Sequence, residues 1–128
     1  MGFTHARLKD AAAALFRALD ERDASRVATA FAGFLEDLEG YLRNDLRADY
    51  GALLHSPSDF VTRLAERILS EAESFPRAFA ELRTRWRGVA AGDLLSEAFR
   101  DELETFVSEL LKRMRVEERL LAALESVA

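Results

Sequence analysis

Five polar side chains interrupt stretches that are otherwise apolar, and their types are the ones in this sequence that could do chemistry. They are His5, Asp45, Asp49, Arg113 and Glu117. A charged group inside a protein must be paired or hydrogen-bonded, because an isolated buried charge is strongly destabilising. Three arrangements are open: a solvated boundary, an internal salt-bridge cluster, or a metal or ligand site whose ligands are His5, Asp45, Asp49 and Glu117.

These polar positions belong to apolar stripes with alternating steps of three and four residues. The apolar residues on this spacing include Leu8, Ala12, Leu15, Leu38, Leu42, Ala65, Ala72, Phe99 and Leu103. The spacing is typical of amphipathic helices packed at a shallow angle. It predicts helices near residues 4–20, 24–54, 57–87 and 93–126.

The expected connections are short, which makes neighbouring helices antiparallel. The sequence therefore predicts an all-α fold, an antiparallel up-down-up-down four-helix bundle formed by residues 1–128 as one domain. In that bundle the ends of the second and fourth helices and the start of the first lie together. The five polar side chains could then converge at one end.

Residues that commonly begin or end helices set the boundaries of the predicted helices. Ser56 can cap a helix for which Pro57 suits the first position. Gly88 suits the end of the third helix, and Asp93 is expected to cap the fourth. Pro76 falls inside the third helix and predicts a kink, because proline lacks an N–H group and clashes with the preceding turn.

Composition excludes several classes of function. The 128 residues include 18 Lys and Arg against 23 Asp and Glu, no Cys and only two His. The absence of Cys excludes thiol catalysis and thiolate metal sites, and the net charge of −5 argues against a nucleic-acid partner. No apolar run is long enough to cross a membrane, and the first ten residues do not resemble a signal peptide. We therefore expect a cytoplasmic protein.

The sequence lacks the motifs of several common enzyme classes. The sequence has no Glu-x-x-His pair, Gly-rich phosphate loop, nucleophile elbow or zinc-protease motif. We therefore expect no enzymatic activity.

A small basic and aromatic group ends the third predicted helix. It consists of Arg83, Trp86 and Arg87. Cations stabilise a helix C-terminus and Trp86 falls on the apolar stripe, so these residues could serve the fold alone. Arg and Trp also dominate the energetics of protein interfaces, so the same group could be a surface for an acidic partner.

Residues 3–54 resemble the first half of hemerythrin-like domains. That half has a His in its first helix, followed by a long helix with a His and then an acid four residues later. His5 matches the first ligand. Asp45 stands in place of the second His, and Asp49 stands in place of the bridging acid.

The resemblance continues into the second half of the chain. Ala72 occupies the place of the next His within Ile68–Glu73. In Arg113–Glu118, Arg113 replaces the last His while Glu117 is retained. The departures fall at the ligand positions of the family's di-iron site. The resemblance thus implies a hemerythrin-like bundle that has lost its metal.

A second resemblance involves the regulator of sigma D and AlgQ family. The segment Leu38–Leu42, followed by Tyr50, is similar to that family's second helix, and Arg113–Leu121 is similar to its last helix. The resemblance implies a metal-free four-helix bundle that binds the promoter-recognition domain of a sigma factor. The sequence departs from the family at Asp45-Leu46, where the family has a Gly-His pair.

These observations predict a non-enzymatic regulatory or protein-interaction domain on a hemerythrin-like scaffold, without a cofactor. It would bind an unidentified protein, and neither nucleic acid nor membrane, as a monomer or a homodimer. One alternative is an anti-sigma transcription regulator. Another is a metal- or oxygen-sensing protein with an atypical site at His5, Asp45, Asp49 and Glu117.

Overall fold

The computed structural model describes residues 2–45, 55, 57–72 and 75–127, and this part of the chain is helical without a strand. The predicted all-α class is therefore confirmed. The elements are α1 (Gly2–Asp20), α2 (Ala24–Gly40), a π-helical turn η1 (Tyr41–Asp45), α4 (Asp59–Ala72), α5 (Phe75–Trp86), a 3₁₀ turn η2 (Ala91–Leu95) and α6 (Glu97–Val127).

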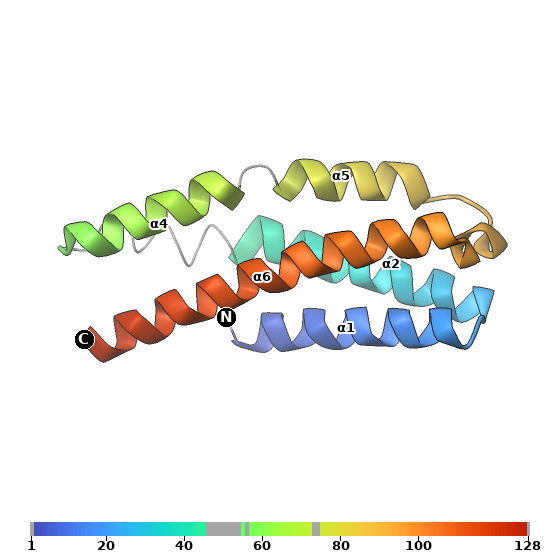
Figure 1. The fold of residues 1–128 in the computed structure, drawn as a ribbon, viewed down its shortest axis with the longest axis horizontal. Coiled ribbons are helices and arrows are strands. Elements are labelled where there is room, and N and C mark those ends of the chain that lie inside the picture. The colour runs from blue at the N-terminus through green and yellow to red at the C-terminus, as the bar shows by residue number, and fades with distance from the viewer. Residues whose placement is uncertain (1, 46–54, 56, 73–74, 128) are drawn as a thin grey trace.

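A tight turn reverses the chain between α1 and α2. Arg22 adopts a left-handed conformation with φ of 56°. Asp23 then caps α2, because its carboxylate accepts a hydrogen bond from the Arg26 N–H over 3.2 Å. The two helices consequently pack against each other in opposite directions (Figure 1).

The remaining helices complete the arrangement along the same long axis. α4 and α5 follow each other, and α6 runs past α1 and α5 along nearly the whole length of the molecule (Figure 1). Within the described residues, none of the helices has both the length and the apolar character that a membrane crossing requires.

Most of the core comes from the predicted apolar stripes, and residues outside them, including Val27, Phe34 and Met114, complete it. Among stripe residues with described side chains, the apolar members are buried apart from Leu42 and Trp86, which are half-buried. Phe99 packs edge-on against Phe31 and Trp86, with ring centroids 5.0 and 5.1 Å apart. The side chain of Ala72, a predicted core position, lies outside the described residues. The pattern thus identified the buried faces correctly.

The predicted third helix over residues 57–87 is wrong as a single helix. α4 ends at Ala72 and α5 begins at Phe75, so Pro76 stands in the first turn of a new helix. Proline is tolerated there because N–H groups in the first turn have no partner within the helix. Pro76 therefore marks a helix start and not an internal kink.

Two predicted helix starts are displaced by two to four residues. α4 begins at Asp59, and Ser58 Oγ accepts a hydrogen bond from the Val61 N–H over 3.4 Å. α6 begins at Glu97, and Ser96 Oγ accepts one from the Phe99 N–H over 3.2 Å. The prediction that Asp93 caps the last helix is wrong, because Asp93 lies within η2.

The predicted second helix extends to residue 54, whereas α2 ends as an α-helix at Gly40 and continues as the π-helical turn η1. Residues 46–54 lie outside the described part of the chain.

Candidate functional site

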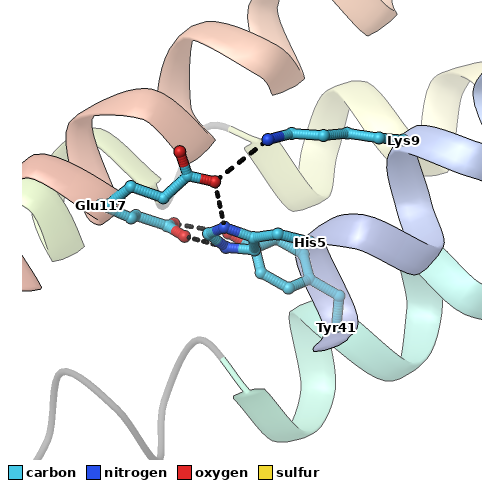
Figure 2. Close-up of polar contacts among 5 residues, drawn as sticks. His5, Lys9, Tyr41 and Glu117 are labelled. Atoms are coloured by element: carbon cyan, nitrogen blue, oxygen red, sulfur yellow. Dashed lines mark hydrogen bonds and ion pairs between the residues drawn. The ribbon is translucent and has the colours of Figure 1, made fainter. Parts of the chain in front are cut away.

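His5, near the start of α1, lies between two carboxylates of α6 (Figure 2). Its Nε2 is 2.8 Å from Glu117 Oε2, and its Nδ1 is 3.0 Å from Glu118 Oε1. An ionised carboxylate can only accept hydrogen bonds, so each ring nitrogen must carry a proton to donate. The geometry is therefore that of an imidazolium cation.

Glu117 is a buried carboxylate with both oxygens in use. It is 2% exposed, and its second oxygen, Oε1, accepts a hydrogen bond of 2.5 Å from the Tyr41 hydroxyl. Tyr41 is itself buried, and its ring meets the His5 ring edge-on with centroids 5.7 Å apart. The interior part of the site is thus closed by its own side chains.

The outer part of the site is a second ion pair at the protein surface. Lys9, one turn after His5 in α1, places Nζ 3.1 Å from the Glu118 oxygen that also accepts from His5. Two cations then face two carboxylates, so the charges balance. We call His5, Lys9, Tyr41, Glu117 and Glu118 the His5 network.

The surroundings of His5 favour its charged form. Burial by itself would lower the pKa of His5, but the hydrogen bonds to Glu117 and Glu118 outweigh it and raise the pKa above 6.5. In turn, the hydrogen bonds from His5 and Lys9 lower the pKa of Glu118 below its ordinary value. Both shifts stabilise the ionic form of the network.

The π-helical turn places Tyr41 in this network. Tyr41 is its first residue, and its N–H points to the carbonyl oxygens of Asp37 and Leu38 at the end of α2. Sequence reasoning assigned Leu42 to the apolar stripe and missed Tyr41. A signal was present, because Tyr41 follows the buried Leu38 by three residues.

Lys9 and Glu118 were also missed in the sequence, which singled out Glu117 alone of the two acids. Glu117 is buried, whereas the Glu118 side chain is 44% exposed. Neither Lys9 nor Glu118 interrupts an apolar stripe, so the spacing alone carried no signal for them.

Of the other three residues of the predicted polar cluster, only Arg113 has a described side chain. Arg113 is half-buried, with its guanidinium carbon 5.0 Å from the centroid of the Phe75 ring. The side chains of Asp45 and Asp49 lie outside the described residues. The structure thus brings His5 and Glu117 together and places Arg113 against an aromatic ring.

The described residues do not fit a metal centre. No group of three or more His, Asp or Glu side chains among them is placed to hold a metal ion. Both nitrogens of His5 lie at hydrogen-bond distance from carboxylates, whereas a metal ligand needs a free nitrogen lone pair.

The predicted partner surface lines a cleft between α2 and the end of α5. Arg83, Trp86 and Arg87 all contribute to this cleft, whose volume is about 400 Å³. Trp86 Nε1–H donates to Glu102 Oε2 over 2.6 Å, which holds the indole at the side of the cleft. The three residues therefore share one surface depression.

Comparison with protein-family models, curated proteins and solved structures gave no match to this chain. The resemblances to hemerythrin-like domains and to the regulator of sigma D family therefore stay predictions.

Proposed function

We propose that this chain is a non-enzymatic protein-interaction domain on a metal-free, up-down-up-down four-helix bundle. In this topology α4 and α5 together form the third helix. The antiparallel packing of α1 and α2 and the course of α6 alongside α1 and α5 support it. A cytoplasmic location and a regulatory role belong to the same proposal.

The prediction that the domain binds no metal is supported by the His5 network, whose polar atoms already have partners within the protein. The two nitrogens of His5 and the two oxygens of Glu117 are all engaged within the protein. A metal ion at this place would have to displace a proton from His5 and compete with the Tyr41 hydroxyl for Glu117. The site is suited to holding helices together.

Elemental analysis tests this part. We expect less than one tenth of an equivalent of iron, manganese or zinc after incubation with each metal and desalting, and the same result for His5→Gln. Stoichiometric metal that is lost in His5→Gln would support the metal- or oxygen-sensing alternative instead.

The interaction part of the proposal assigns the cleft at Arg83, Trp86 and Arg87 as the partner surface. Its floor includes the buried residues Phe31 and Leu35, and its edge carries Arg and Trp side chains. An apolar floor with such residues around it is the usual composition of a protein-binding site.

Site-specific photo-cross-linking in cells tests this assignment. Ala32 is exposed and lines the cleft, whereas Ala13 is exposed on α1 away from it. A photoreactive residue at position 32, but not at position 13, should give a discrete protein adduct. A sigma factor in that adduct would select the anti-sigma alternative, and equal labelling from both positions would contradict the assignment.

A further inference from the structure

The cleft between α2 and α5 has walls of opposite charge. Glu36 and Glu39 stand on the α2 wall, while Arg83 and Arg87 stand on the wall formed by the end of α5. Small and apolar side chains lie between them, including the exposed Ala32. The cleft thus has an acidic wall and a basic wall on the two sides of an apolar floor.

The charges on the two walls are incompletely paired within one chain. Glu39 pairs with Arg43, and its other carboxylate oxygen is 4.0 Å from Arg83 Nη1. Glu36 and Arg87 are exposed, and neither makes an ion pair or side-chain hydrogen bond with another described residue. With respect to the described residues, Glu36 and Arg87 are thus an unpaired anion and an unpaired cation that face solvent on opposite walls.

We propose that the occupant of this cleft is a second copy of the same chain. In this dimer the two clefts face each other and are related by a twofold axis parallel to the cleft. The rotation interchanges the positions of the acidic and the basic wall. The acidic wall of each copy then lies opposite the basic wall of its partner. A closed, self-complementary dimer of this kind is the most common form of homo-oligomer. This inference rests on the proposed interaction function and identifies its partner.

The side chains on the walls suit this arrangement. Arginine has an apolar stem that can cover a floor of small residues such as Ala28 and Ala32, while its guanidinium reaches a carboxylate beyond them. In the dimer Arg87 of each copy can reach Glu36 of the other. The arrangement produces two equivalent ion pairs from side chains that have no charged partner among the described residues of their own chain.

The size of the contact sets its expected strength. A standard interface buries roughly 800 Å² on each partner, which would be a tenth of this chain's 8020 Å² of accessible surface. The cleft by itself is smaller than that. We therefore expect a concentration-dependent dimer with a dissociation constant in the micromolar range, weakened by salt.

A charge-reversal experiment tests the proposal directly. Sedimentation equilibrium of the complete chain should show a monomer–dimer equilibrium. Reversal of the basic wall, Arg83→Glu with Arg87→Glu, should weaken association by at least about tenfold, and reversal of the acidic wall, Glu36→Lys with Glu39→Lys, should do the same. An equimolar mixture of the two variants should associate again, because opposite charges then meet on both sides.

A matched control reverses two exposed charges on α4, Arg63→Glu with Glu66→Lys, and should dimerise like the original chain. If a wall variant fails to fold, as judged by circular dichroism, Ala32→Arg provides a second test by filling the cleft, and should abolish association.

A chain that stays monomeric up to millimolar concentration would overturn the proposal. A dimer insensitive to the wall reversals and to Ala32→Arg would also overturn it. A cross-link from position 32 to a different protein would overturn the dimer while leaving the proposed interaction function intact. The absence of any adduct would contradict the interaction function itself.

Discussion

His5 is held between two carboxylates, so we expect the stability of the fold to decrease as the pH rises. Its pKa is raised in the folded protein above the ordinary value of 6.5. The stabilisation is therefore complete below about pH 6.5 and is lost as the pH rises through the folded pKa. In that window the free energy of unfolding should fall by up to about 1.4 kcal/mol per pH unit.

Urea unfolding between pH 6 and pH 9 measures this effect. His5→Gln should remove the alkaline loss, whereas His55→Gln, at the exposed second histidine, should retain it. An alkaline limb unchanged in His5→Gln would show that another group titrates there.

Tyr41 contributes one hydrogen bond to a buried, charged acceptor. Hydrogen bonds to charged groups are worth more than neutral ones, and truncation leaves Glu117 Oε1 without a described donor. We expect Tyr41→Phe to reduce the free energy of unfolding by about 1–3 kcal/mol. Chemical denaturation at neutral pH checks this, and a change below roughly 0.3 kcal/mol would indicate that water replaces the hydroxyl without loss.

The start of helix α6 is capped by a different residue from the one that the sequence predicted. Ser96 Oγ accepts the Phe99 N–H, whereas Asp93 is exposed within η2. Ser96→Ala should cost about 1 kcal/mol, and Asp93→Ala should cost less than about 0.5 kcal/mol. Thermal melting of the two variants side by side measures the difference. The opposite order would mean that the helix in solution begins at Asp93.

The sequence predicted helix faces far better than helix ends. Residues such as Leu8, Leu15 and Leu103 are fully buried because apolar burial along a helix is periodic, and periodicity can be read from one chain. Helix ends depend on a single hydrogen bond, and Ser56, Ser58, Asp93 and Ser96 are all suitable cap residues. Local chemistry does not choose between such neighbours.

The His5 network was predictable in part, for a related reason. His5 and Glu117 interrupt apolar stripes and so were visible as polar intrusions. Tyr41 was missed although it follows Leu38 by a helical step of three, because a tyrosine is largely apolar and does not stand out as a polar intrusion. Lys9 and Glu118 lie at the edges of the buried helix faces. Polar residues are common there, so the sequence did not single out these two.

At the scale of the whole molecule, two kinds of interaction hold different parts of the bundle. Near the start of α6, Phe99 packs in an aromatic cluster with Phe31 and Trp86. Eighteen residues later, or roughly 27 Å along an ideal helix, Glu117 lies in the ionic His5 network. Apolar packing does not titrate near neutral pH, whereas the network does. The two parts should therefore respond differently to pH.

Hydrogen exchange can resolve this difference residue by residue. Loss of the His5 proton leaves one ring nitrogen without a hydrogen to donate, facing a carboxylate that can only accept. After correction for intrinsic exchange rates, amides of α1 near Lys9 and those of α6 near Glu117 should lose protection between pH 6 and pH 9. Amides near Phe31 and Phe99 should change much less, because their opening does not break the network. In His5→Gln both sets should be independent of pH. A uniform loss across the original chain would mean that the bundle opens only as a whole, so that the network and the aromatic cluster form one cooperative unit.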